Sequence, residues 1–248
     1  MKLRGVYIFP AACLLSLSAC SPQPSIVSDG FEGPTLSALW STRKFVPGAV
    51  EIQSAVVRQG KGAARITLHH GDQMGKERGT ILERAELMEA RELWAREDSS
   101  YSYSFSLFLP RDFPVLPNRL ILAQWKQDCP DANCDPASPV IALRYEAGLL
   151  CMTVQAAPAK DTVYRLGDEI RNRWLDFRVR IRFSRSADGW FNASLNGRQI
   201  VEYRGPTAYP PHYGYKDPGR FYFKMGLYRN QLPETMTIYV DEYRKEPA

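Results

Sequence analysis

Short stretches of alternating polar and apolar residues, separated by turn signals, run through most of this 248-residue chain. Such alternation is typical of β-strands with one buried face. The segments expected to be strands are residues 63–69, 101–109, 140–145, 149–155, 174–183, 190–195, 198–203, 221–228 and 236–243. Asn196-Gly197 is the strongest hairpin signal. Helical periodicity is scarce, and residues 89–96 are the best candidate for a short helix. The sequence therefore predicts an all-β domain, a sandwich or jelly roll.

The N-terminal residues have the features of an export signal. Lys2 and Arg4 precede an apolar run, residues 6–17, that is too short to span a membrane. The run ends in Leu17-Ser-Ala-Cys20, which resembles the cleavage box of bacterial lipoproteins; the alternative is an ordinary secretory signal with a chance cysteine. We expect a signal peptide over residues 1–19, lipidated Cys20, a tether over 20–28 and a single domain over 29–248. Since Ser21 follows the cysteine, the resemblance implies an outer-membrane location, periplasmic or external.

The net charge of the chain does little to restrict which partners it can bind. The net charge is +5, and loss of residues 1–19 leaves 30 basic against 27 acidic side chains, or +3. A mildly basic surface is compatible with an anionic partner. Basic stripes of the kind that bind nucleic acid are absent, so no nucleic-acid partner is expected. We expect a monomer whose only membrane contact is the lipid anchor.

Two of the five cysteines lie close together in the sequence. Cys129 and Cys134 flank a four-residue segment, and an exported chain favours a disulfide there. The alternative is a structural calcium loop, although no standard calcium-loop spacing is present. Its ligands would be Asp128, Asp131, Asn133 and Asp135. No other metal or cofactor is expected.

The expected strand over residues 221–228 has two unlike faces. One face carries Phe221, Phe223, Met225 and Leu227 and is expected to pack in the core. The other carries Tyr222, Lys224, Gly226 and Tyr228, and we interpret it as a groove wall in which the glycine leaves room for a ligand. The alternative is an ordinary half-exposed strand.

Two further segments have the same pattern. Residues 82–87 place Arg84 and Glu86 on one face. Residues 120–126 place Gln124 and Lys126 on one face, opposite Ile121, Ala123 and Trp125. If the three strands are neighbours, their polar faces form a continuous lining suited to a sugar chain that bears carboxylates.

Together these motifs resemble those of jelly-roll polysaccharide lyases of the glucuronan lyase and heparin lyase I type, and the pattern of alginate lyases. The motifs are Glu83-Arg-Ala-Glu-Leu87, Gln124-Trp125, Asn196-Gly197 with Tyr203-Arg-Gly205, and Tyr222-Phe-Lys-Met-Gly-Leu-Tyr228. The resemblance implies a concanavalin-like β-jelly-roll sandwich of two antiparallel sheets with a concave substrate groove. It also implies cleavage of an acidic polysaccharide that contains uronate, by β-elimination.

The resemblance also implies roles for individual residues. Arg84 and Gln124 would neutralise the substrate carboxylate, which stabilises the enolate-like transition state. Tyr228 would protonate the leaving oxygen, and in some members it also removes the C5 proton. Lys224 would hold substrate or lower the pKa of the tyrosine, and Tyr222 and Glu86 would line the substrate site.

One position departs from the family pattern. Lys126 stands where a histidine is common, and a lysine acts as base only if its pKa is lowered. Otherwise Tyr228 would be both base and acid, or a histidine such as His212, in an aromatic loop, would enter the groove. Alternatives to the lyase are a non-catalytic carbohydrate-binding lipoprotein and, ranked last, a glycoside hydrolase, because Glu83 and Glu86 are expected on opposite faces.

Overall fold

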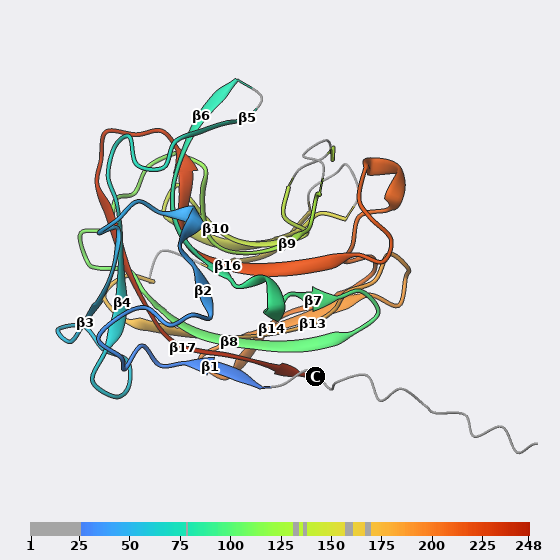
Figure 1. The fold of residues 1–248 in the computed structure, drawn as a ribbon, viewed down its shortest axis with the longest axis horizontal. Coiled ribbons are helices and arrows are strands. Elements are labelled where there is room, and N and C mark those ends of the chain that lie inside the picture. The colour runs from blue at the N-terminus through green and yellow to red at the C-terminus, as the bar shows by residue number, and fades with distance from the viewer. Residues whose placement is uncertain (1–25, 78, 131–133, 136–137, 157–160, 167–169) are drawn as a thin grey trace, which may run out of the picture.

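Two antiparallel sheets packed face to face make up the computed structural model of the chain (Figure 1). The structure describes residues 26–248 except 78, 131–133, 136–137, 157–160 and 167–169. Sheet A comprises, in spatial order, β15 (Arg198–Arg204), β14 (Trp190–Leu195), β13 (Trp174–Arg182), β8 (Ser100–Phe108), β17 (Met236–Pro247), β4 (Ala63–Leu68) and β3 (Val50–Gln53), with β1 (Val27–Asp29) paired to β17.

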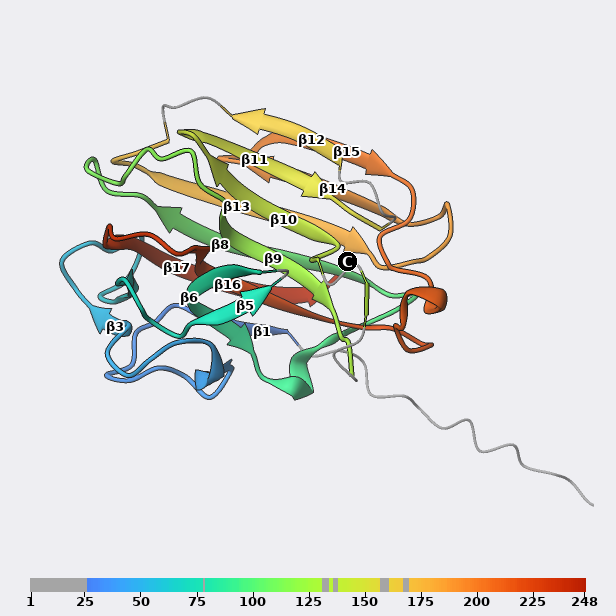
Figure 2. The same cartoon turned by 90° about the horizontal axis from the view of Figure 1, so that it is seen from above.

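Sheet B lies above sheet A in Figure 1, and its outer face is concave. Its strands, in spatial order, are β12 (Asp161–Leu166), β11 (Leu149–Val154), β10 (Ile141–Glu146), β9 (Leu120–Gln127), β16 (Arg220–Asn230), β6 (Thr80–Glu89) and β2 (Trp40–Ser41). The short strands β5 (Gly75–Glu77) and β7 (Ala95–Arg96) pair with β6 and β16. Seen from above, β12, β11, β10, β9, β16 and β6 follow one another across the molecule (Figure 2). The expected sandwich of two antiparallel sheets is confirmed.

The inward faces of both sheets form one apolar core. On β16 the alternation is as expected, since Phe221, Phe223, Met225 and Leu227 all pack in this core. The aromatic rings of Trp125 and Phe223 from sheet B contact that of Tyr103 from sheet A, with ring centroids 5.6 and 5.5 Å from that of Tyr103. Because the core fixes one side of each strand, the opposite side chains of sheet B must face the concave surface.

The predicted helix over residues 89–96 is wrong. That segment contains the end of β6, a single 3₁₀ turn, η2 (Arg91–Leu93), and the two-residue strand β7. The apolar side chains of this segment pack in different places: Ala95 packs in the core, and the ring of Trp94 lies against that of Tyr222. The other 3₁₀ turns among the described residues are η1 (Thr42–Lys44) and η3 (Pro211–Tyr213).

A β-bulge in β9 corrects the face assigned to Ile121. Leu143 of β10 pairs with Ala123, but the next residue, Arg144, pairs with Ile121, so Leu122 is an extra residue. Leu122 and Ala123 both pack in the main core. Ile121 is therefore on the concave side, in a small apolar cluster with Leu82, Ala142 and Tyr228.

Cys129 and Cys134 form a disulfide, as expected from their spacing. The predicted signal peptide and Cys20 lie outside the described residues, as do Asp131 and Asn133 of the alternative calcium loop. Within the part of the chain that the structure describes, no group of three or more histidine, cysteine and acidic residues is placed to hold a metal ion. No helix there is long and apolar enough to cross a membrane.

Candidate functional site

The predicted site residues of β6, β9 and β16 meet on the concave face of sheet B because these strands are neighbours. β16 lies between β6 and β9, so Tyr228 pairs with Arg84, and Lys224 pairs with Gln124. Two residues before Lys224 on β16, Tyr222 pairs with Lys126. The groove lining expected from alternation is therefore a set of cross-strand neighbours.

Glu86 holds the centre of this cluster together. Its carboxylate accepts hydrogen bonds from Gln124 Nε2 at 2.5 Å and from Lys224 Nζ at 3.0 Å, and Arg84 Nη1 is 3.9 Å away. Gln124 and Glu86 are each 1% exposed, and Lys224 is 3% exposed. A carboxylate so enclosed orients its neighbours, and the expected role of Glu86 in lining the substrate site stays a prediction.

Two guanidinium groups flank the ring of Tyr228. Arg84 Cζ lies 4.4 Å and Arg119 Cζ 4.5 Å from the ring centroid, and Lys224 Nζ lies 5.6 Å from it. The hydroxyl donates a hydrogen bond of 3.0 Å to Glu77 Oε2. Glu77 ends β5, which projects with the start of β6 above sheet B (Figure 1). The phenol is thus held by a residue that lies next to the turn of this hairpin.

Burial controls the acidity of the groove residues. It raises the pKa of Tyr228, outweighing the charges of Arg119 and Arg84, which lower it. Lys224 is not among the main causes of this shift, so its expected role, to hold substrate or to lower this pKa, stays a prediction. Burial also lowers the pKa of Lys224 to about 8 and lowers that of Lys126 below its usual range. The site thus combines a protonated phenol with two lysines whose pKa values are lower than usual.

Gly226 does not provide space for a ligand, contrary to expectation. A Cβ atom at this position would lie 2.3 Å from Ala85 O and 2.8 Å from Glu86 Cα. The residue has φ +142° and lies beside the bulge where β16 passes β9. Glycine is needed here so that the backbones of β16 and β6 can approach each other.

Four groove residues were missed by the sequence analysis: Glu77, Arg119, Lys44 and Trp94. Arg119 lies just before β9, and its Nη1 is buried with no hydrogen-bond partner in the described part of the chain. Lys44 and Trp94 are brought to the groove because η1 and η2 fold against sheet B. None of the four lies on an alternating strand face, so the sequence offered no signal for them.

Comparison with known proteins identifies the family. A family model described as polysaccharide lyase matches residues 31–244. The chain belongs to the polysaccharide lyase family. No curated protein sequence matches it.

Solved structures of similar fold include lyases. An endo-β-1,4-glucuronan lyase from the fungus Trichoderma reesei is 18% identical, with a TM-score of 0.63, over 82% of this chain and 88% of that one. The alginate lyase Aly36B, in complex with alginate trisaccharide, is 10% identical, with a TM-score of 0.61, over 92% and 100%. AlgAT5, an alginate lyase of polysaccharide lyase family 7, is 13% identical, with a TM-score of 0.54, over 82% and 84%. At these identities the likeness shows that the polysaccharide lyase shares their fold.

His212 of the lyase lies apart from this cluster. It is exposed in η3, and its ring lies 4.2 Å from that of Tyr213. The loop around it packs against the disulfide segment, where Asp135 N donates a hydrogen bond of 3.1 Å to Tyr213 O. No contact joins His212 to Arg84 or Tyr228 among the described residues, so Lys126 is the stronger candidate base.

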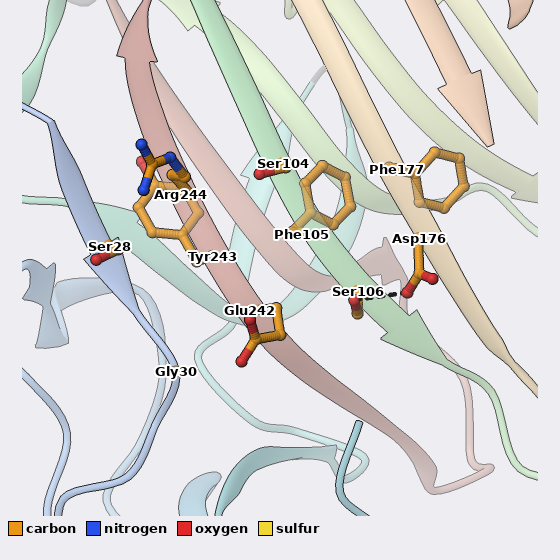
Figure 3. Close-up of a pocket in the computed structure, with 10 residues that line it drawn as sticks. All are labelled: Ser28, Gly30, Ser104, Phe105, Ser106, Asp176, Phe177, Glu242, Tyr243 and Arg244. Atoms are coloured by element: carbon orange, nitrogen blue, oxygen red, sulfur yellow. Dashed lines mark hydrogen bonds between the residues drawn. The ribbon is translucent and has the colours of Figure 1, made fainter. Parts of the chain in front are cut away.

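A cavity of about 350 Å³ is formed by strands of sheet A of the lyase (Figure 3). Its Asp176 accepts a hydrogen bond from Ser106 and forms an ion pair of 2.8 Å with Arg58. These polar groups satisfy one another, and they belong to the sheet opposite the candidate site.

Proposed function

We propose that this polysaccharide lyase cleaves a uronate-containing acidic polysaccharide by β-elimination. The observation that carries the proposal is the neutral phenol of Tyr228 set between two guanidinium groups, with two lysines of lowered pKa nearby. Around it, Arg84, Arg119, Lys126 and Lys224 outnumber the acidic groups. Such a site favours an anionic sugar and can both give and take protons.

In the proposed reaction the uronate carboxylate binds to Arg84 and Arg119, and Gln124 supplies a further hydrogen bond. The position of both guanidinium groups, with Cζ atoms 4.4 and 4.5 Å from the Tyr228 ring centroid, supports this role, because a carboxylate bound by them would lie beside the phenol. Neutralising the carboxylate makes the C5 proton more acidic, since negative charge develops there in the transition state.

Lys126 in its neutral form would take the C5 proton. Its pKa is lowered by burial, and it lies within electrostatic range of Glu77, Arg84 and Glu86. The electron pair of the C5–H bond forms the C4–C5 double bond, and the bond from C4 to the glycosidic oxygen breaks. Tyr228 protonates that oxygen, and a proton returned from Lys126 to the phenolate resets the site.

The test is incubation with glucuronan, alginate, heparin and hyaluronan, followed by ultraviolet absorbance of the unsaturated uronate product. We expect absorbance to rise with one or more of these polymers. Since the base must be neutral, activity should rise with pH through the pKa of Lys126, and Lys126→Gln should remove most of that activity. Absence of an unsaturated product with every polymer would refute the proposal.

A further inference from the structure

The outer face of sheet A, on the side of the molecule opposite the groove, carries a run of arginines. Arg178 and Arg180 on β13 alternate with Phe177, Val179 and Ile181, whose side chains pack in the core. Because side chains alternate along a strand, both arginines point outward, and both are exposed. This face therefore presents positive charge to the outside of the molecule.

Cross-strand pairing extends the run of arginines into a row across five strands. Arg178 pairs with Ser104 of β8, and Ser104 pairs with Arg244 of β17. Arg244 pairs with Ser28 of β1, and Arg178 also pairs with Ser194 of β14. Figure 3 shows Arg244 between Ser28 and Ser104. Since a serine strand separates the two arginines, their backbones are ~10 Å apart, and hydroxyl groups lie between them.

Most acidic groups on this face already have a basic partner. The ion pairs, each of 2.8 Å, are Arg244–Glu246, Arg182–Asp188 and Arg58–Asp176. Glu202 on β15 and Glu242 on β17 form no ion pair with a described residue. Glu202 faces Asn192 and is thus two strands away from Arg180. The acidic groups therefore leave part of the arginine charge free.

The unpaired charge belongs to Arg178 and Arg180. Neither forms an ion pair with a residue that the structure describes. Arg180 lies over the half-buried ring of Trp190, with its guanidinium carbon 5.8 Å from the ring centroid. Guanidinium groups bind phosphate oxygens through several hydrogen bonds, and serine hydroxyls can add to them. This face is thus suited to a flat array of phosphate groups.

The N-terminal segment of the chain leads to the same face. Ser28 ends the row of arginines and serines, and β1 lies on the side of the molecule away from the groove (Figure 1). If Cys20 carries lipid, as the sequence predicts, eight residues separate Ser28 from the anchor. An extended segment of that length spans at most ~28 Å. The anchor would therefore keep this face close to the membrane.

We propose that the outer face of sheet A docks on the membrane, where Arg178, Arg180 and Arg244 bind the phosphate groups of anionic lipids. Trp190 fits this partner, because tryptophan is favoured at the boundary between membrane and water. Docking adds a second membrane contact to the lipid anchor expected from the sequence. It also turns the groove of sheet B away from the lipid, so that a polysaccharide can enter. The proposal is independent of the reaction proposed above.

The experiment measures sedimentation of the chain with vesicles. Every chain carries Cys20→Ser, so that no lipid anchor masks the contribution of the face. One vesicle contains equal parts of phosphatidylglycerol and phosphatidylcholine, and the other contains phosphatidylcholine alone. We expect tighter binding to the anionic vesicle, and weakening of that binding by salt. The apolar N-terminal run is the same in every variant, so differences between variants report on the face.

The decisive variant is Arg178→Glu. It should lower the partition coefficient for anionic vesicles about 30-fold, because it changes two unit charges and each contributes about 5-fold near an anionic surface. Arg180→Glu should have a similar effect. The matched control is Arg165→Glu, which makes the same charge change at an exposed position on β12 of sheet B. Its binding to vesicles should be unchanged.

Three results would overturn the proposal. One is equal binding to the two kinds of vesicle, and another is an equal loss in Arg178→Glu and Arg165→Glu. The third is a loss in Arg178→Glu of binding to an anionic polysaccharide but not to vesicles, which would assign the face to a polysaccharide. Cleavage of a soluble polymer by Arg178→Glu should be unchanged, because Arg178 lies on the sheet opposite the groove.

Discussion

The hydroxyl of Tyr228 is the atom on which the proposed chemistry depends. Tyr228→Phe keeps the ring between Arg84 and Arg119 but removes the proton and the hydrogen bond to Glu77. We expect turnover to fall about 10²- to 10⁴-fold, the usual effect of losing a positioned acid. Steady-state kinetics, with substrate binding measured separately, should show a much smaller change in affinity.

Tyr222→Phe is the control for this variant. Tyr222 lies on the same face of the same strand, but its ring packs on Trp94 outside the cluster around Tyr228. Its loss of turnover should be much smaller. Near-full turnover by Tyr228→Phe would move the acid to another residue, and an equal loss of binding and turnover would mean that Tyr228 only holds the sugar.

The alkaline side of the pH profile tests the identity of the acid in a second way. If Tyr228 donates its proton, activity falls as pH rises through the pKa of its phenol, which burial raises. The charge of Glu77 also raises this pKa, whereas that of Arg119 lowers it. Glu77→Gln should therefore shift the alkaline limb of kcat to lower pH, and Arg119→Gln should shift it to higher pH. Shifts in the same direction would show that another group titrates.

The alternation of polar and apolar residues was sufficient to place Arg84, Gln124, Lys224 and Tyr228 on one face, because side-chain direction along a strand has a period of two. It could not place Glu77 or Arg119. Those residues reach the phenol from a hairpin and from a loop, and their positions depend on how the chain folds back over sheet B. Local periodicity contains no such information.

At the scale of elements, the close contact between β16 and β6 predicts that substitution of Gly226 strongly destabilises the fold. Gly226→Ala would place a methyl group against Ala85 O and impose a strained φ, so we expect the free energy of unfolding to fall by about 2 kcal/mol or more. Chemical denaturation measures this change.

Gly197→Ala is the matched comparison. Gly197 has φ +79° in the turn between β14 and β15, and no atom lies within 4 Å of its added Cβ. Only the backbone preference is lost, so the expected cost is about 1 kcal/mol. A larger loss at Gly197 than at Gly226 would contradict the close approach of β16 to β6.

Most expected strands match observed ones to within about two residues, the usual uncertainty of strand ends. The prediction of a hairpin from residues 190–195 and 198–203 is confirmed, because Asn196 and Gly197 both have the positive φ that its turn requires. The failures have local causes. The helix expected over residues 89–96 becomes η2 and β7, and the bulge at Leu122 moves Ile121 to the concave face. Both depend on pairing with distant strands.

At the scale of the whole molecule, lipid attachment at Cys20 stays a prediction from the sequence. Growth with a labelled fatty acid should label the natural protein but not Cys20→Ser. Cys13→Ser, which alters the other cysteine of the N-terminal segment, should remain labelled. Label in Cys20→Ser, or none in the natural protein, would contradict the lipoprotein prediction.

The position of the last strand affects when the fold can form during synthesis. β17 contains 12 residues at the end of the chain, yet it lies in the middle of sheet A between β8 and β4, and β1 also pairs with it. Until the ribosome has released these residues, β8 and β4 each have an unpaired inner edge, and such edges promote aggregation. The nascent chain therefore cannot complete its sandwich from the N-terminus onward, and a chain cut short before Met236 would have two exposed sheet edges.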